Sequence, residues 1–275
     1  DPKGPVYLMA AREVFEEEIA PVEVDGARWQ RIAPGALDED GLDALVASLV
    51  AAKRPLVVTS YLGRNAAAVG ELVRLCERIG IGVHESCPNY MNFPADHACY
   101  VGQQGNEKVQ TPALAEADLV LVLDCDVPWI PLFNRPSDAA KVVHIDIDPI
   151  KEKTPLWYIP ATQVFRADVA TALRQIHRRL DGMKLDEAAV AERRSHYASM
   201  HKHTMCTQPR TRFTSGASSL GWNGGAAVGM KMAEPDKTVV CMTGDGSYMF
   251  SIPSTVHWIS RKYQAPFLTV VFNNG

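Results

Sequence analysis

The stretch TVVCMTGDGSYMFSIPSTVHWISRKYQAPFLTVVFNNG, residues 238–275, contains two apolar runs separated by an amphipathic segment. The runs 238–243 and 267–272 are rich in β-branched and other apolar residues, which predicts two strands. Residues 255–264 between them have the spacing of a helix. Strand, helix and strand in this order predict a right-handed crossover between parallel neighbours. We therefore expect a parallel α/β sheet here.

Gly244, Asp245 and Gly246 follow the first of these strands at its carboxyl end. Ligands bind at this edge of open parallel sheets, because the connecting loops separate there. The two glycines allow a sharp turn and a close approach of a ligand to the backbone. Asp245 supplies a hard oxygen, while the backbone N–H groups of Gly246 and Ser247 and the Ser247 hydroxyl suit phosphate oxygens.

The second strand ends in Asn273-Asn274, twenty-six residues after the Gly-Asp-Gly sequence. A parallel crossover brings both strand ends to one edge, so Asp245 is expected near the asparagine pair. Carboxylate and carboxamide oxygens beside phosphate-binding groups suit Mg²⁺, which shares its coordination shell with phosphates. The residues predict a Mg²⁺–diphosphate site. The alternative is two unrelated loop ends, because both sequences are also common in turns.

This spacing resembles the signature of the thiamine-diphosphate-dependent enzymes. The resemblance implies that Asp245 and Asn274 bind the metal ion that bridges to the cofactor diphosphate. It also implies that a backbone carbonyl at position 276, just past the printed sequence, is a further ligand. We therefore expect the sequence to be part of a longer chain.

A second segment, SGASSLGWNGGAAVG at 215–229, resembles the stretch of this family that encloses the aminopyrimidine ring. The resemblance implies that the Ser218 carbonyl accepts the 4′-amino group and that Leu220, followed by Gly221, holds the cofactor bent. Residues 223–225 are Asn-Gly-Gly, where many members have Gly-Leu-Pro, so the local turn departs from the family. The alternative is an ordinary glycine-rich helix entry.

Residues 36–180 alternate apolar runs with amphipathic segments, which indicates a parallel sheet covered on both faces. Strands are predicted at 55–60, 81–85, 118–124 and 141–148, helices at 38–53, 66–80, 110–117, 169–180 and 186–203, and a long loop at 86–106. The predicted fold class is α/β with two doubly wound, mainly parallel sheets.

The family resemblance implies three domains. Residues 1–35 would be the tail of the pyrimidine-binding domain, with a last strand at 5–10, and a linker. Residues 36–182 would be a Rossmann-like central domain, and residues 183–275 the start of the diphosphate-binding domain. The chain as a whole resembles the second half of an acetolactate-synthase-type or 2-oxo-acid-decarboxylase-type subunit.

The resemblance implies an enzyme, a lyase or transferase, that uses thiamine diphosphate and Mg²⁺ on a 2-oxo acid. Decarboxylation and carboligation both stay open. The family's catalytic glutamate comes from the first domain, so no residue here is assigned to it and the chain alone is expected to be inactive. One alternative is a non-catalytic subunit or remnant that assembles with a full-length partner. A dinucleotide-dependent oxidoreductase is another alternative, but its glycine-rich fingerprint is missing.

Several other residues invite a functional interpretation. Gly63, between a strand and a helix, is a candidate phosphate site for FAD or ADP, against an ordinary tight turn. Three other groups have a structural interpretation. Possible metal ligands that fit a solvated surface better are His201, His203 and Cys206. Histidines in or beside strands, more often structural than catalytic, are His84, His97 and His144. The tryptophans expected as core or interface anchors are Trp129, Trp157 and Trp258.

Composition limits the remaining possibilities. A net charge of −4, with 47% hydrophobic residues among 275, gives no general attraction to nucleic acid or anionic membranes. The six cysteines include no C-x-x-C pair, which favours a reducing compartment, and we expect a cytoplasmic protein, with organellar targeting left open. The family resemblance implies a homodimer or homotetramer, because each active site lies between subunits.

Overall fold

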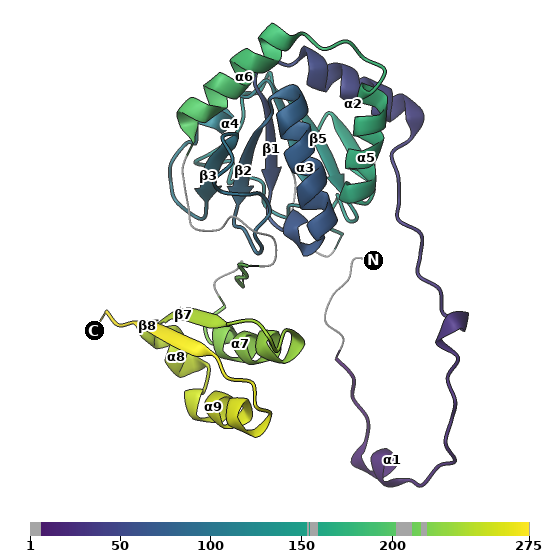
Figure 1. The fold of residues 1–275 in the computed structure, drawn as a ribbon, viewed down its shortest axis with the longest axis vertical. Helices are drawn as coiled ribbons and strands as arrows, with labels where there is room; N and C mark the ends of the chain where they lie inside the picture. Colours follow the sequence, from purple (N-terminus) through teal and green to yellow (C-terminus); the bar gives the residue numbers. More distant parts are fainter. Residues whose placement is uncertain (1–6, 153, 155–158, 202–210, 216–218, 275) are drawn as a thin grey trace.

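The computed structural model describes residues 7–152, 154, 159–201, 211–215 and 219–274 (Figure 1). Its main body is a parallel sheet in the order β3-β2-β1-β4-β5-β6. The strands are β1 Pro55–Thr59, β2 Gly82–Ser86, β3 Tyr100–Gln104, β4 Leu119–Leu123, β5 Lys141–Asp146 and β6 Gln163–Arg166. This order is that of dinucleotide-binding domains, and the strand order reverses between β1 and β4.

Helices cover both faces of this sheet. They are α2 Glu39–Ala51, α3 Ala66–Ile79, α4 Pro112–Glu116, α5 Val169–Leu180 and α6 Glu187–Met200. Alternate residues of one strand point to opposite faces. Val57 therefore packs with α2, α3 and α5, whereas Val58 packs with α4 and with Tyr197 of α6. The predicted α/β class with parallel sheets is confirmed.

Two edge strands were not predicted. β3 lies inside the expected loop at 86–106, and β6 follows an irregular segment. Each has a single neighbouring strand, so both carry polar residues, such as Gln103 and Arg166, in place of a continuous apolar run. The loop before β3 is itself anchored, because Met91 and Phe93 are buried in the core.

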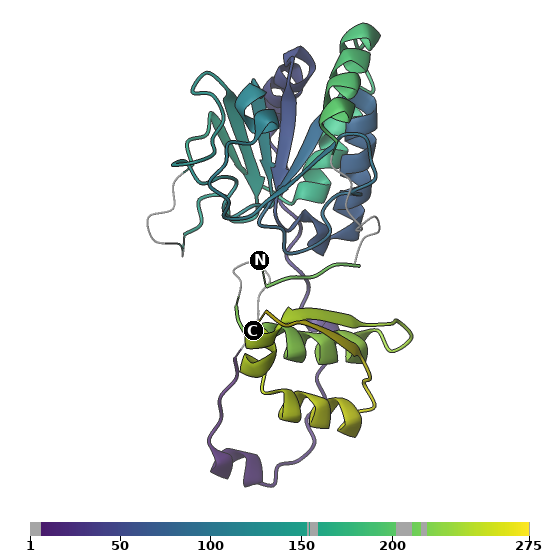
Figure 2. The ribbon, with the colours of Figure 1, turned by 90° about the vertical axis from the view of Figure 1, so that its left-hand side faces the viewer.

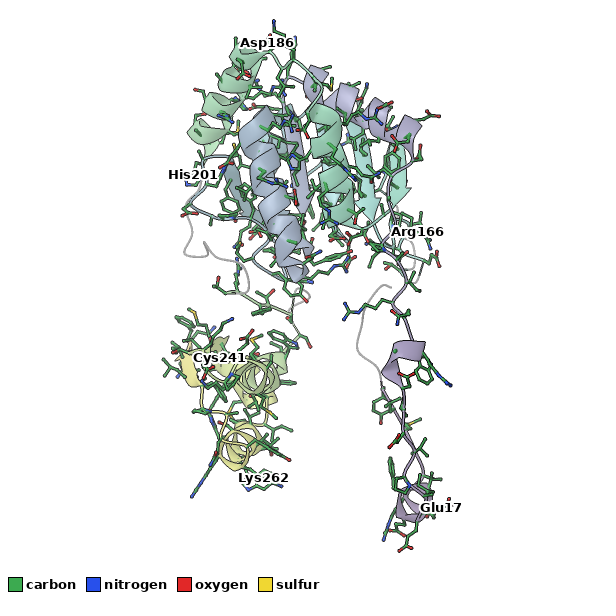
Figure 3. All side chains as sticks on the ribbon, turned by 45° about the vertical axis from the view of Figure 1, so that its right-hand side comes forward. Glu17, Arg166, Asp186, His201, Cys241 and Lys262 are labelled. Carbon is green, nitrogen blue, oxygen red and sulfur yellow. The ribbon has the colours of Figure 1, made fainter. Side chains whose placement is uncertain are left out.

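A second, two-stranded parallel sheet is formed by β7 Val240–Gly244 and β8 Leu268–Phe272. Its helices are α7 Trp222–Ala233, α8 Asp245–Phe250, which was not predicted, and α9 Pro253–Lys262. Figure 2 shows α7 and α9 on one side of the two strands. Cys241 and Thr243 are buried on that side, while Val240 and Met242 are exposed on the other. Cys241 and Lys262 are labelled in Figure 3.

Residues 7–35 are exposed and contain one short helix, α1 Arg12–Glu16, and a 3₁₀ turn at Gly26–Arg28. The strand predicted at 5–10 is not formed over residues 7–10. A strand is held by hydrogen bonds to a neighbouring strand, and no described strand of either sheet pairs with residues 7–10. In the part of the chain that the structure describes, the helices are too short or too polar to span a membrane.

Candidate functional site

The carboxyl edge of the β7–β8 sheet brings the predicted metal ligands to one place. The register pairs Gly244 with Phe272, so Asp245 and Asn273 follow at the same edge, and Asn274 comes next. Asp245 is half-buried and Asn274 is exposed. One carboxylate and one carboxamide at a shared strand edge are the oxygen donors that Mg²⁺ accepts while keeping waters and phosphate oxygens.

The sharp turn expected at Gly244 and Gly246 is not present. Gly244 has φ −80°, and the chain passes directly from β7 into α8 at Asp245. The open space expected there is present: an added Cβ would meet no atom within 4 Å at Gly246, and at Gly244 only Phe272 O, at 4.0 Å. The first N–H groups of a helix lack intrahelical acceptors, so those of Gly246 and Ser247 suit a diphosphate.

Gly221 is the glycine at this site whose backbone needs the absence of a side chain. It precedes α7 with φ 84°. An added Cβ would lie 2.7 Å from the carbonyl oxygen of Phe250, the last residue of α8. Its N–H donates to Ser247 Oγ at 3.1 Å. The structure thus joins the segment predicted to enclose the aminopyrimidine ring to the segment that follows β7.

Ser247 makes a second internal hydrogen bond that the sequence did not reveal. Its hydroxyl donates to Asn223 Oδ1 at 3.2 Å. Asn223 Nδ2 in turn donates to Cys241 Sγ at 3.5 Å. The hydroxyl proton is therefore used within the protein, and the backbone N–H is the phosphate-binding group that Ser247 retains.

The other two residues of the predicted cofactor site are Leu220 and Ser218. Leu220 is 60% exposed, just before the turn at Gly221, which leaves its side chain accessible to a ligand. Ser218 lies outside the described residues. No set of three or more His, Cys, Asp or Glu side chains within the described residues could hold a metal ion. A metal here would rely on Asp245, the Asn274 carboxamide and oxygens from its ligand, and this donor set fits a Mg²⁺-bound diphosphate.

A charged cluster at the carboxyl edge of the large sheet was missed by sequence reasoning. Lys151 Nζ lies 2.8 Å from Asp146 Oδ2, 2.9 Å from Asp126 Oδ1 and 2.7 Å from the Tyr61 hydroxyl. Burial alone would lower the pKa of Lys151, but the two carboxylates outweigh it and raise that pKa. The signal was available: aspartates end two neighbouring parallel strands here, as Asp245 does at β7.

Asp124 ends β4 where the strand order reverses. It has φ 45°, and its carbonyl oxygen accepts hydrogen bonds from the backbone N–H groups of Ser60 and Tyr61. Its buried carboxylate meets Arg64 at 2.8 Å. Burial raises the pKa of Asp124 to about 7, although Arg64 acts in the opposite direction. These ion pairs occupy the edge where a dinucleotide-binding domain receives its ligand.

Gly63 is placed as a packing residue. Its N–H donates to Asn92 Oδ1 at 2.9 Å, and an added Cβ would lie 2.1 Å from Met91 O. Asn92 also donates to the carboxylate of buried Glu85. Gly63 therefore fixes the loop before β3, and its N–H is not available to a phosphate.

The remaining candidates are mostly structural where they are described. His201, at the end of α6 (Figure 3), contacts Tyr100 O through Nδ1 at 3.0 Å. His97 Nδ1 accepts from the Cys99 N–H. Trp129 is buried in the core, whereas Trp258 is exposed, so of its two predicted roles, core or interface, only the interface role stays open. His84 and His144 are buried in β2 and β5; His203, Cys206 and Trp157 lie outside the described residues.

The fold is that of an α/β protein with two parallel sheets, and oxygen donors follow both strands at one edge of the smaller sheet. The family model "Thiamine pyrophosphate enzyme, central domain" matches residues 42–176, and the model of the C-terminal TPP binding domain matches residues 195–275. The chain belongs to the thiamine pyrophosphate enzymes. Thiamine pyrophosphate is another name for thiamine diphosphate.

Individual relatives agree with this assignment. Acetolactate synthase isozyme 1 large subunit of Escherichia coli is 27% identical, covering 90% of this chain and 51% of the relative. Benzoylformate decarboxylase of Pseudomonas aeruginosa is 24% identical, covering 100% of this chain and 58% of the relative. The chain thus spans about half the length of the curated relatives it matches.

A solved structure supports the fold. The thiamine diphosphate-dependent 4-hydroxybenzoylformate decarboxylase of Rhodococcus jostii has a TM-score of 0.68 and 20% identity, covering 90% of this chain and 53% of that chain. At this identity the likeness concerns the architecture. The predicted domain limits at 35, 182 and 183 and the individual site residues stay predictions.

Proposed function

We propose that this chain forms the central domain and the start of the diphosphate-binding domain of an enzyme that uses thiamine diphosphate and Mg²⁺ on 2-oxo acids. The observation that carries the proposal is the pairing of Gly244 with Phe272, after which Asp245 and Asn274 follow at one sheet edge. Decarboxylation and carboligation both fit, since the relatives' names include acetolactate synthases and a benzoylformate decarboxylase.

The chain's own residues would bind and orient the cofactor. Asp245 and Asn274 would hold Mg²⁺ through oxygen atoms, and the N–H groups of Gly246 and Ser247 would face the diphosphate. Leu220 would press on the cofactor from the start of α7, and the Ser218 carbonyl would take the aminopyrimidine amino group. When bound, the cofactor supplies an electron sink for cleavage of the bond next to the 2-oxo group.

No residue of this chain is assigned to the catalytic glutamate that the family uses. We therefore expect the 275 residues alone to bind cofactor without turnover. A homodimer or homotetramer, a cytoplasmic location, and FAD or ADP in the central domain stay predictions. The competing hypothesis is a non-catalytic subunit that assembles with a full-length partner. That hypothesis predicts that the complete protein also shows no turnover.

The test is calorimetric titration of thiamine diphosphate into the full-length protein, with Mg²⁺ and with EDTA. We expect binding that needs Mg²⁺ and that Asp245→Asn abolishes. Asp236→Asn, the same substitution in the exposed turn before β7, is the matched control and should bind normally. Absence of binding by the unmodified protein would overturn the enzyme proposal. Binding without decarboxylation of any 2-oxo acid would favour the non-catalytic subunit.

A further inference from the structure

Asn223 connects three elements of the small unit through one side chain. It lies in the first turn of α7. Its Oδ1 accepts the Ser247 hydroxyl of α8 at 3.2 Å, and its Nδ2 donates to Cys241 Sγ of β7 at 3.5 Å. Glycine could make neither contact. The side chain therefore links α7 to both α8 and β7.

The Ser247 hydroxyl both donates and accepts a hydrogen bond within the protein. It carries one proton, which it donates to Asn223, and it accepts the N–H of Gly221 at 3.1 Å. The hydroxyl thus points toward α7. Ser247 is only two residues after Asp245, so its orientation also fixes the first turn of α8, where the metal ligand and the free N–H groups lie.

The residue type suits this position. The acceptor oxygen satisfies the hydroxyl, and the amide donor satisfies the sulfur of a buried cysteine. Burial raises the pKa of the Cys241 thiol, so the sulfur is an uncharged acceptor at neutral pH. Aspartate would accept from Ser247 but would offer the sulfur no donor, and it would add a negative charge beside a diphosphate site.

We propose that Asn223 is a positioning residue for the cofactor diphosphate: it turns the Ser247 hydroxyl toward α7 and fixes the start of α8 so that backbone N–H groups alone meet the phosphates. This inference rests on the proposed function. It assigns the Ser247 hydroxyl an internal role, in contrast to the direct phosphate contact expected from the sequence.

The experiment compares Asn223→Ala, Ser247→Ala, the double variant and Ser247→Thr in the full-length protein. The dissociation constant for thiamine diphosphate at saturating Mg²⁺ is measured by calorimetry, and Tm is measured without cofactor. Loss of one or two neutral hydrogen bonds should weaken binding about five- to tenfold. Both single variants should weaken binding, and the double variant should lose less than the product of the two factors, because both residues contribute to the shared Ser247–Asn223 bond. Ser247→Thr keeps the hydroxyl and should stay within about twofold of the unmodified protein.

Gly229→Ala is the matched control on α7, because its added Cβ meets no atom within 4 Å. Its affinity should not change. A much larger loss for Ser247→Ala than for Asn223→Ala would show direct contact with the phosphate and overturn the inference. Unchanged affinity, or a fall in Tm with unchanged affinity, would also overturn it. If the unmodified protein binds no cofactor, the proposed function itself fails. This outcome differs from failure of the inference, in which the unmodified protein binds cofactor but the variants do not follow the expected order of affinities.

Discussion

The two parallel sheets of this chain differ in how fully their faces are covered. In the large sheet, β1 and β4 are buried along their whole length, between helices on both sides. In the small sheet, Val240 and Met242 of β7 lie opposite Leu268 and Val270 of β8, and all four are exposed. Apolar burial is the main source of stability, so the large sheet holds most of it.

Most of the apolar burial and the predicted cofactor-binding residues lie in different parts of the chain. The described core of the small unit is a cluster of Val228, Val256 and Ala265. Yet this unit carries Asp245 and every described residue of the predicted cofactor site. Within these 275 residues, the residues predicted to bind the cofactor thus lie on the part with the smaller described core.

The largest expected effect contrasts two leucines, one in each sheet. Leu121 in β4 is 0% exposed and Leu268 in β8 is 58% exposed. Leu121→Ala should cost about 3 to 5 kcal/mol of unfolding free energy, and Leu268→Ala less than about 1. Urea unfolding followed by far-UV circular dichroism measures the first, and hydrogen exchange in β8 the second. Equal losses would contradict the comparison.

The next effect concerns pH and the large sheet. The folded pKa of Asp124 is about 7, above its ordinary 3.8, so the folded state binds the proton more tightly. Its contribution to stability is complete below pH 3.8 and is lost as pH rises toward 7. Asp124→Asn should remove about 2 to 4 kcal/mol of this pH-dependent change.

Urea titrations from pH 4 to pH 8 measure it, with Asp236→Asn as the control. The asparagine keeps the size of the side chain and tolerates the left-handed backbone at φ 45°. Identical pH profiles for Asp124→Asn and the unmodified protein would refute this assignment.

Gly221→Ala tests the small unit alone. An alanine there would adopt φ 84° unfavourably and place its Cβ 2.7 Å from Phe250 O. We expect a loss of about 1 to 3 kcal/mol from this unit, with the large sheet unaffected. Hydrogen exchange should accelerate in α7 and α8 but not in β1. Gly225→Ala, whose Cβ meets nothing within 4 Å, is the control.

The smallest effect is on the uncovered face. Met242 is 60% exposed, so Met242→Thr should change unfolding free energy by less than about 0.5 kcal/mol. Urea unfolding at two protein concentrations checks this. A loss above about 1 kcal/mol that grows with concentration would mean that this face is covered by association in solution.

The sequence was informative where burial is continuous. The runs at β1, β4 and β5 are apolar because both faces of those strands are buried, and they were predicted nearly to the residue. Asp245 and Asn274 could be placed at one edge because strand–helix–strand topology determines which ends coincide. The shared edge of the two strands follows from pattern alone, whereas the metal-binding role of Asp245 and Asn274 stays a prediction.

Contacts between side chains far apart in the sequence could not be predicted. The bond from Ser247 to Asn223 spans 24 positions and depends on a rotamer and on the approach of α7 to α8. The hydrogen bond from Lys151 to the Tyr61 hydroxyl likewise joins residues 90 positions apart, although the aspartates around it could be placed at the strand ends. Helix α8 was missed because its GDGSYMF sequence has glycine and serine, which propensity assigns to turns.

The polar edge strands of the large sheet have a consequence for the behaviour of the protein at high concentration. An open strand edge offers unpaired N–H and C=O groups to a strand of another molecule. β3 ends in two glutamines, and β6 begins with glutamine and ends with arginine, each strand having five residues or fewer. Short, polar borders of this kind discourage edge-to-edge aggregation. We infer that the polar residues that interrupt the apolar pattern of these strands also protect the sheet from edge-to-edge association with other molecules.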